Sequence, residues 1–468
     1  MGKGKKLGKD IGLMTIGTCG SKLLTFFLVP LYTSCLSTSE YGIADLITTT
    51  ISLLFPLFTV TIGEAVLRYA LDKDIDRGQV FSIGVLINTV GFIVLLAFSP
   101  LWLKFDFLNE YYIFFLLYYL SYVTYQFFSY FAKGIDKVTI YTISGICQTV
   151  TTIITNVIAL IVFNSGIEGY LLSFIVSNTI AALVIFIFAD LRSYFNLKTI
   201  NADLVKEMLT YSFPMIPNSI SWWVSNSSDK YILKWICGAT ITGIYSVSYK
   251  IPTILSIFYN IFLSAWRLSA VDEFGSKNSI RFHSEVLSKL FEALCIVAAG
   301  IILMNKFLAK VLYANDFYQA RMFVPILVIA VLVHGIGEFY GTLYTSAKQT
   351  KMLFYSSMIG ALANISLNII LIPKLAGMGA AAATLISYFV ILLFRAVHTR
   401  KIMKLSLDYR KMGMLSALLL IMSIIQTLDR KYSLLCSVLL FVCMLCLTKQ
   451  SIVEVINIVR VKVAGKKK

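Results

Sequence analysis

The chain has 468 residues, of which 58% are hydrophobic and only 14% are charged, and its mean hydropathy is +0.80. Soluble domains are about 45–50% apolar and about 25% charged, so this composition excludes a soluble globular protein and indicates an all-α polytopic membrane protein. The net charge of +17 is spread between apolar segments and at both ends, which is typical of cytoplasmic loops and does not indicate nucleic-acid binding.

Apolar stretches that are long enough to cross a bilayer follow one another along the chain. A transmembrane helix needs about 20 mostly apolar residues, and stretches of this kind predict about fourteen spans. The predicted spans are residues 11–36, 43–68, 80–103, 111–132, 139–163, 169–190, 209–235, 244–268, 286–304, 323–346, 352–372, 379–397, 412–428 and 433–448. The basic N-terminal stretch runs into a long apolar segment without a small-residue cleavage site, so we interpret it as part of an uncleaved first span.

Lysine and arginine are concentrated in alternate loops and at both ends of the chain. The positive-inside rule then places both termini in the cytoplasm, and we expect a multi-pass protein of the bacterial cytoplasmic (inner) membrane. The sequence has no GxxxxGK[ST] motif, so it predicts no ATP hydrolysis by this chain. Transport would instead use an ion gradient, the membrane potential or the substrate gradient.

The two halves of the chain share weak sequence similarity. YGI at 41–43 opens span two and TGI at 242–244 opens span eight, while Arg68 and Arg267 occupy matched positions near the ends of these spans. The offset of about two hundred residues predicts two parallel copies, an architecture known from transporters, although chance similarity of apolar segments is the alternative. The predicted divisions are an N-terminal lobe at 1–200, a C-terminal lobe at 201–405, and two extra helices with a basic tail at 406–468.

Several motifs taken together resemble one transporter family. They are LSTSEYG at 36–42, YSFPMIP at 211–217 with SDK at 228–230, GIYS at 243–246, and NISLNIILIP at 364–373 followed by GMGAAA at 377–382. On these motifs the chain resembles the polysaccharide transporters of the MOP (multidrug/oligosaccharidyl-lipid/polysaccharide) superfamily, the Wzx-like oligosaccharide flippases. The resemblance implies a MATE-like fold with two pseudo-symmetric six-helix lobes around a central cavity, plus two C-terminal helices. It also implies alternating access and a polyprenyl-diphosphate oligosaccharide as cargo.

Cations within the predicted spans are candidates for binding the diphosphate of such a cargo, because an unpaired anion is very costly in a low-dielectric layer. Lys22 lies about twelve residues, or roughly 18 Å, into span one. Arg68 and Arg267 lie near the inner ends of their spans, where a guanidinium suits a phosphate. Lys230 and Lys250 are expected to form an outer cationic zone. The alternatives are a structural ion pair for Lys22 and snorkelling to the headgroups for the two arginines.

Titratable residues within the spans are candidates for ion coupling. Asp229 and Glu64 could bind an ion or simply satisfy a neighbouring cation. His334 and Glu338 are four residues apart and therefore share one helix face, which suits proton coupling but equally suits a structural polar pair. Asp45, near the outer end of span two, is expected to face water.

Two prolines lie close together near the inner end of span seven, at Pro214 and Pro217. A proline within a helix removes a backbone hydrogen bond and can kink the helix, so we interpret the pair as a hinge. Static kinks are the alternative.

Within the predicted spans, lysine and arginine outnumber aspartate and glutamate, which favours an anionic cargo. The sequence therefore predicts a flippase that moves a lipid-linked oligosaccharide to the outer leaflet for cell-surface polysaccharide synthesis (O-antigen or capsule). It predicts no enzyme activity, catalytic residue, cofactor or metal site. Expected partners are the glycolipid, the bilayer, a coupling ion (H⁺ or Na⁺) and polysaccharide polymerase machinery. The alternatives are a multidrug or cation antiporter of the same superfamily and a peptidoglycan-precursor flippase.

Overall fold

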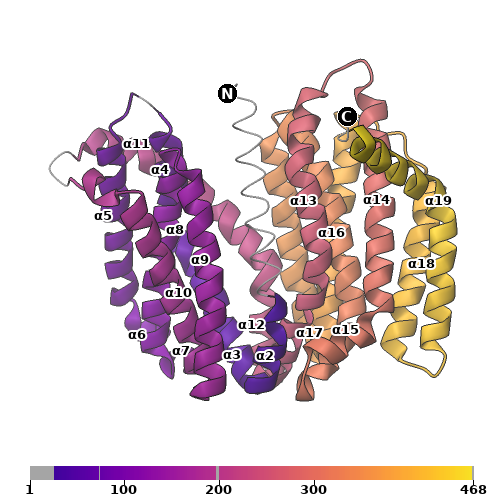
Figure 1. Cartoon of the computed structure of the whole chain (residues 1–468), viewed down its shortest axis with the longest axis horizontal. Coiled ribbons are helices and arrows are strands. Elements are labelled where there is room, and N and C mark those ends of the chain that lie inside the picture. Colours follow the sequence, from indigo (N-terminus) through magenta and orange to yellow (C-terminus); the bar gives the residue numbers. More distant parts are fainter. Residues whose placement is uncertain (1–25, 73, 197–199, 466–468) are drawn as a thin grey trace. The chain divides into compact units, whose positions relative to one another are not determined.

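The computed structural model of the protein describes residues 26–72, 74–196 and 200–465 (Figure 1). Side chains are described up to Gln450, apart from those of Ala265, Leu268 and Thr350. The described residues form helices that are joined by turns and short segments, and they contain no strand. The prediction of an all-α fold is confirmed.

The chain divides into two compact units, Met1–Tyr231 with Gly238–Gly243, and Ile232–Cys237 with Ile244–Lys468. The first unit contains α2 Val29–Cys35, α3 Thr38–Phe58, α4 Ile62–Ala70, α5 Arg77–Ala97, α6 Ser99–Trp102, α7 Asp106–Asn109, α8 Tyr112–Gly134, α9 Val138–Val157, η1 Ile158–Val162, α10 Gly166–Phe188, η2 Leu191–Tyr194 and α11 Ala202–Ser212. Helix α12, Met215–Ser248, contributes to both units. The second unit contains α13 Lys250–Asp272, α14 Ser279–Leu303, α15 Asn305–Leu312, η4 Asn315–Met322, α16 Val324–Ser346, α17 Thr350–His398, η5 Thr399–Lys401, α18 Tyr409–Leu428 and α19 Ser433–Gly465. The predicted lobe boundaries at residues 200 and 405 stay a prediction.

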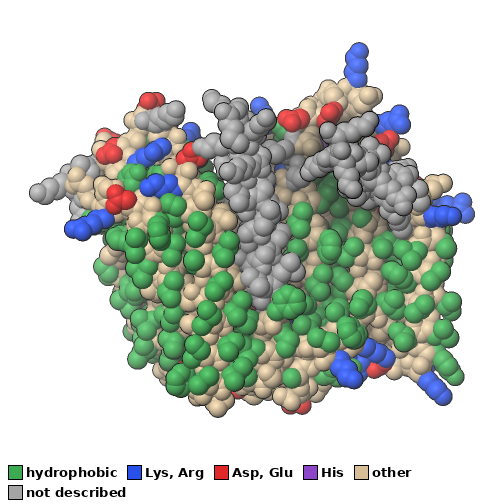
Figure 2. All heavy atoms as spheres, in the orientation of Figure 1, with side chains coloured by type: hydrophobic (Ala, Val, Ile, Leu, Met, Phe, Trp, Pro, Cys, Tyr) green, Lys and Arg blue, Asp and Glu red, His purple; other side chains and the backbone are tan. Residues whose placement is uncertain are grey.

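Nine helical segments of the described residues are long and apolar enough to cross a membrane. They are Thr38–Phe58, Arg77–Ala97, Val138–Val162, Gly166–Phe188, Ser279–Leu303, Val324–Ser346, Lys351–Lys401, Tyr409–Leu428 and Ser433–Gln450. The longest of these breaks at Ala376 and so includes the two spans predicted at 352–372 and 379–397. Apolar side chains cover the flanks of the helices in Figure 2, and charged side chains gather near the helix ends. The chain is therefore a multi-span helical membrane protein, whereas a total of fourteen spans stays a prediction.

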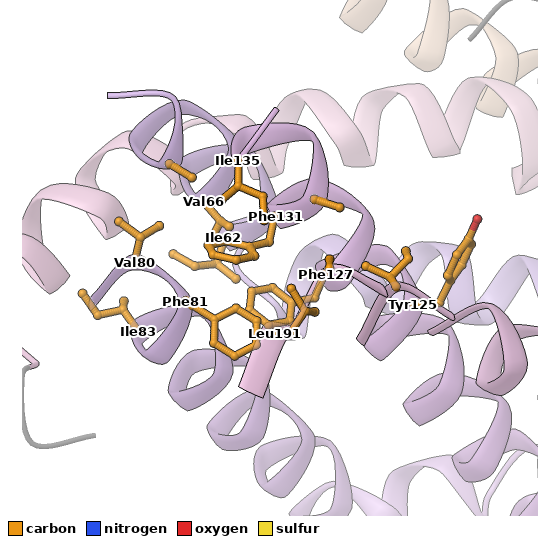
Figure 3. Packing of buried hydrophobic residues seen from close by; sticks show 14 of the residues in the cluster. Ile62, Val66, Val80, Phe81, Ile83, Tyr125, Phe127, Phe131, Ile135 and Leu191 are labelled. Atoms are coloured by element: carbon orange, nitrogen blue, oxygen red, sulfur yellow. The ribbon is translucent and has the colours of Figure 1, made fainter. Parts of the chain in front are cut away.

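The core of the first unit is a cluster of buried aliphatic and aromatic side chains, part of which is shown in Figure 3. Phe81 of α5 lies 5.3 Å from Phe127 and 4.8 Å from Phe131 of α8, measured between ring centroids. Ile62 of α4 and Met208 of α11 are fully buried in the same cluster. Because lipid chains are as apolar as these side chains, close packing stabilises such a core more than removal from water does.

Helix α3 begins with a reciprocal capping arrangement. The Ser37 hydroxyl accepts a hydrogen bond from the Glu40 backbone N–H at 3.2 Å, and the Glu40 carboxylate accepts one from the Ser37 backbone N–H at 2.7 Å. This capping box satisfies two backbone donors that the first helical turn leaves without partners. It gives a structural reason for the Ser37 and Glu40 positions in the LSTSEYG motif.

The capping box predicts that Ser37→Ala lowers the free energy of unfolding by about 1 kcal/mol, because the substitution removes the acceptor for the Glu40 N–H. The measurement is the thermal unfolding midpoint of the detergent-purified protein. Ser39→Ala, two residues further along, is the matched control and should leave the midpoint unchanged. Equal midpoints for the two variants would contradict the assignment of the cap.

The predicted span at 43–68 is divided into α3 and α4, which corrects the prediction of one continuous helix. Val60 and Thr61 both adopt left-handed backbone conformations, with φ of 52° and 49°. This region is unfavourable for β-branched residues and interrupts the helix. The Thr61 hydroxyl donates to the Ser212 carbonyl at 2.7 Å, which ties the interruption to the end of α11. Glu64 and Arg68 therefore lie on the short helix α4, whereas Asp45 lies on α3.

Pro214 and Pro217 lie at a helix junction, which corrects the prediction that both lie inside the span at 209–235. Helix α11 ends at Ser212, Pro214 lies in the following turn, and Pro217 is the third residue of α12. Proline is tolerated here because the first turn of a helix has no intrahelical partner for its missing N–H. A hinge at this junction stays a prediction.

The predicted span at 244–268 is also interrupted. Helix α12 breaks first at Gly238, just before this span, where φ is 84° and ψ is 172°. The helical segment that follows ends at Ser248, inside the span. Pro252 accounts for this second break, because its ring would clash with the carbonyl four residues earlier. Lys250 is consequently the first residue of α13, whereas the predicted span at 244–268 places it about seven residues inside one helix.

An exposed ion-pair group closes the turn between α18 and α19. The Asp429 carboxylate pairs with the Lys306 ammonium and with the Arg321 guanidinium, the latter at 2.7 Å. The hydrogen bond from Lys306 and, after it, that from Arg321 hold the pKa of Asp429 below its ordinary value. Because the carboxylate is about one-third exposed, the gain in stability is small.

This group predicts a pH dependence with a defined sign. A depressed folded-state pKa stabilises the protein above the unfolded pKa of about 4, and the stabilisation is lost as the pH falls through the folded pKa. Asp429→Asn should therefore lower the unfolding midpoint slightly at pH 7 and flatten its decline under acid conditions. Asp316→Asn, on the nearby exposed η4, is the control and should retain the decline of the parent protein.

Candidate functional site

The first group of candidate residues surrounds Glu64 on α4. The Tyr130 hydroxyl of α8 donates to the Glu64 carboxylate at 3.0 Å. The Lys133 ammonium lies 4.5 Å from the centre of the Tyr130 ring. Glu64 is half-buried, whereas Arg68, one turn further along α4, is exposed. The structure thus adds Tyr130 and Lys133 to this group, which sequence spacing could not do because α8 is distant along the chain.

Lys230 of α12 forms an ion pair with Asp45 of α3, with Nζ and Oδ2 2.7 Å apart. The two side chains are only 12% and 16% exposed. The expectation that Asp45 faces water is therefore wrong: the lysine lets the carboxylate stay largely buried. Asp229 is 2% exposed, and its carboxylate accepts a hydrogen bond from the Lys230 N–H at 2.9 Å. The Asp45 carboxylate therefore compensates the charge of the Lys230 ammonium.

Polar contacts along the first part of α12 hold this ion pair in register with α3. The Trp223 indole N–H donates to the Thr49 carbonyl at 2.8 Å. The Tyr231 hydroxyl lies 2.5 Å from the Thr50 hydroxyl. These contacts lie seven residues before and one residue after Lys230, so they fix the lysine over α3. They account for part of the polar side-chain content that the sequence shows in span seven.

The second unit contains a group of polar side chains around α16. His334 and Glu338 lie one turn apart on this helix, as the sequence predicts, and both are half-buried. The Tyr259 hydroxyl of α13 lies 3.2 Å from His334 Nδ1. The Arg395 guanidinium of α17 donates to the Glu338 carboxylate at 2.9 Å. Three helices therefore converge on the predicted pair.

Arg395 is the largest fully buried side chain among the described residues, with 1% exposure. Besides Glu338, its guanidinium donates to the Gly337 carbonyl at 2.9 Å, the Ser356 hydroxyl at 3.0 Å and the Ser357 hydroxyl at 3.3 Å. Arg395 lies near the end of the predicted span at 379–397, and it is not among the candidate residues that the sequence predicts. Two signals for a buried cation were present in the sequence. Ser356 and Ser357 are adjacent polar residues inside an apolar span, and Glu338 has no lysine or arginine on its own helix.

The remaining predicted cations are more accessible. Arg68 and Arg267 are exposed, and Lys250 is half-buried at the start of α13. Within the described parts of the chain, these three residues form no ion pair. Lys22 lies outside the described residues. No three His, Cys, Asp or Glu side chains in the described ranges converge as metal ligands.

Comparison with solved structures shows which fold the chain has. The fold resembles the lipid II flippase MurJ in an inward closed conformation, with a TM-score of 0.74 and 15% identity over 94% of this chain and 99% of MurJ. It also resembles an inward-facing multidrug resistance MATE family transporter of the MOP superfamily, with a TM-score of 0.69 and 12% identity over 86% of this chain and 95% of that one. A MOP superfamily transporter from Pyrococcus furiosus gives a TM-score of 0.60 at 14% identity over 87% of this chain and 97% of that one. The chain thus has the MATE-like fold that MOP superfamily transporters share.

Sequence comparison identifies the family. The profile of a family described as "Polysaccharide biosynthesis protein" matches residues 7–266, more than half of the chain. The chain belongs to this polysaccharide biosynthesis family, as its motifs predict. A curated relative, the probable low-salt glycan biosynthesis flippase Agl15 of Haloferax volcanii, is 21% identical over 222 residues. That match spans about half of each protein, 47% of this chain and 47% of the relative. The relatives are flippases and transporters, which agrees with the expectation that the chain is not an enzyme.

Proposed function

We propose that this protein is a flippase that moves a polyprenyl-diphosphate oligosaccharide from the cytoplasmic to the outer leaflet. The observation that carries the proposal is membership of a polysaccharide biosynthesis family combined with a fold that MurJ shares over nearly its whole length. Family membership supports a glycan pathway, and the fold supports movement of a lipid-linked precursor. The cell-surface product is O-antigen, capsule or a related polysaccharide.

Arg68, Arg267 and Lys250 are the residues we propose to contact the diphosphate. Their accessibility and their lack of an ion pair in the described residues leave their charges available to an anion. An arginine can bind a phosphate through two parallel hydrogen bonds, which a lysine cannot. We keep Lys22 as a fourth candidate. Lys230 contributes less because Asp45 compensates its charge.

We further propose that transport is coupled to H⁺ or Na⁺ and follows alternating access. His334 and Glu338 lie next to a buried guanidinium and a tyrosine hydroxyl, so a change in protonation there would alter the packing of three helices. Glu64 and Asp229 are the further coupling candidates. The bacterial inner membrane, cytoplasmic termini and an associated polysaccharide polymerase complete the proposal.

A peptidoglycan-precursor flippase is the second candidate, and its support is the structural likeness to MurJ. The family match favours an oligosaccharide cargo over this alternative. A multidrug or cation antiporter is the third candidate, supported by the MATE-like fold. A cationic drug would need accessible carboxylates within the spans, whereas Asp45 and Glu338 are both paired with cations.

The test is mass spectrometry of membrane lipids from cells that lack the protein but retain the enzyme that initiates the glycan. The proposal predicts accumulation of a polyprenyl-diphosphate oligosaccharide, which the parent gene should reverse. The Arg68→Ala and Arg267→Ala variants should reverse it poorly, and the exposed control Arg400→Ala should reverse it fully. Accumulation of peptidoglycan precursor would support the second candidate, and altered sensitivity to cationic dyes with unchanged lipids would support the third.

A further inference from the structure

A polar groove of about 610 Å³ opens on the second unit where α14 begins. One wall is formed by α14 and the turn before it, with Lys277 and Arg281 toward one end and Ser288 and Glu292 further in. Ser406, in the segment before α18, and Gln450, on α19, line the groove as well. Its lining is mainly polar and charged, unlike the apolar flanks that the helices present to lipid (Figure 2).

Two neighbouring helices place this groove at the level of the lipid headgroups. Helix α18 has 20 residues, about 30 Å, which is the length needed to cross the hydrocarbon layer once. Lys411, in its first turn, reaches Glu292 of α14. In α19, Ser433–Gln450 is long and apolar enough to cross the membrane, and Gln450 also lines the groove. Glu292 therefore lies near one edge of the hydrocarbon layer, and the groove extends from there toward water.

The inner end of the groove holds a carboxylate with an unused acceptor. Glu292 is 8% exposed, and its Oε1 accepts a hydrogen bond from the Lys411 ammonium at 2.6 Å. Its Oε2 has no hydrogen-bond partner among the described residues. The Ser406 backbone N–H donates to the Ser284 hydroxyl at 2.9 Å, which holds the segment before α18 against α14 beside the groove. A buried carboxylate oxygen of this kind favours a ligand that brings an N–H donor.

The outer end of the groove is cationic. Lys277 and Arg281 line it, together with Glu285, and Lys289 lies between this end and Glu292 along α14. Arg281 and Glu285 pair at 2.7 Å, but both are exposed, and such a pair contributes little and can rearrange. Lys289 is three residues, about 4.5 Å along the helix axis, from Glu292, so a ligand that reaches both side chains carries a negative group and, one headgroup length away, an N–H cation.

We propose that the groove binds the headgroup of an aminophospholipid of the phosphoethanolamine type. The ammonium donates to Glu292 Oε2, and the phosphate lies beside Lys289, on the side of the groove that faces Arg281. A choline headgroup has no N–H to donate, and an anionic glycerol headgroup brings no cation to the carboxylate. The groove thus selects ethanolamine over choline and over glycerol. This inference concerns a resident lipid and is independent of the transported cargo.

The test compares the purified full-length protein in nanodiscs of phosphatidylcholine that contain either phosphatidylethanolamine or phosphatidylglycerol, all with the same acyl chains. We expect native mass spectrometry to show phosphatidylethanolamine retained at least fivefold over the other two lipids, and its presence to raise the unfolding midpoint. Ser288→Phe fills the groove without removing a charge and should abolish the preference. Thr179→Phe, on the exposed face of α10, is the control and should retain it.

Two further variants separate the two charges of the site. Lys289→Ala should weaken retention of phosphatidylethanolamine, whereas Glu292→Gln should remove the preference over phosphatidylcholine. Equal retention of the three lipids by the parent protein, a preference for phosphatidylglycerol, or a preference that survives Ser288→Phe would each overturn the proposal.

Discussion

Replacing Arg395 with alanine is expected to lower the free energy of unfolding by about 3–5 kcal/mol, because it breaks a buried ion pair by removing one partner. The substitution leaves the Glu338 carboxylate without its guanidinium partner inside a helical bundle. It also removes donors from the Gly337 carbonyl and the Ser356 hydroxyl, which the guanidinium reaches at 2.9 Å and 3.0 Å. The bond to Gly337 joins α16 to α17, and the bond to Ser356 joins the two parts of α17, so the loss affects the packing of three helical segments of the second unit.

The measurement is the thermal unfolding midpoint of Arg395→Ala in detergent, with Arg400→Ala as the control. Arg400 is exposed and lies five residues further along the chain, so its removal should change the midpoint little. A double-substitution cycle then isolates the pair: Arg395→Met and Glu338→Gln together should cost less than the sum of the two single changes. Matching midpoints for Arg395→Ala and Arg400→Ala would show that the buried network does not stabilise the fold.

Substitution of Gly243 with alanine should produce the second largest effect. In the first unit, a Cβ at Gly243 would overlap the Thr38 carbonyl oxygen and lie 2.8 Å from its carbon and 3.0 Å from the Gly42 backbone nitrogen. A Cβ at Gly42 would in turn lie 2.9 Å from the Gly243 nitrogen. Backbone atoms cannot move aside as a flexible side chain can. Separating α3 from α12 is therefore the only relief, at a cost of about 1–3 kcal/mol or more.

Gly300→Ala is the matched control for this substitution. Gly300 lies inside α14, and a Cβ there would have no neighbour within 4 Å. Alanine at this position should be neutral or stabilise the protein by up to about 1 kcal/mol, since glycine is a poor helix former. Equal changes in the unfolding midpoint for Gly243→Ala and Gly300→Ala would show that the close approach of the α3 and α12 backbones is not a determinant of stability.

The contact between Gly42 and Gly243 shows what can be read from the sequence and what cannot. The two glycines stand out as matched positions of the internal repeat, and their motifs indicate the family. Their contact depends on how α12 folds back over α3, and no local pattern encodes that. The break at Val60 and Thr61 likewise has no local signal, because neither residue is a usual helix breaker. The Thr61 hydroxyl that supports the break donates to a carbonyl of α11, which is distant in sequence.

Contacts at the candidate site also divide into those that the sequence predicts and those that only the structure shows. Spacing of four residues places His334 and Glu338 on one helix face, because helical periodicity is a local property. Their partner Arg395 is 57 residues from Glu338 in sequence, and Asp45 is 185 residues from Lys230, so neither ion pair follows from spacing. Polar residues inside apolar spans thus identify where partners are needed, and only the packing of helices shows which partners they find.

Movement of the glycolipid itself is the central claim, and reconstitution tests it most directly. Purified protein is placed in liposomes with the polyprenyl-diphosphate oligosaccharide extracted from cells that lack the protein, and a membrane-impermeant lectin reports the glycan on the outer surface. We predict that the accessible fraction exceeds that of protein-free liposomes, depends on an imposed ion gradient, and falls with Arg68→Ala or Arg267→Ala. An accessible fraction equal to that of protein-free liposomes under every gradient, in vesicles that still transport a cationic dye, would contradict the account.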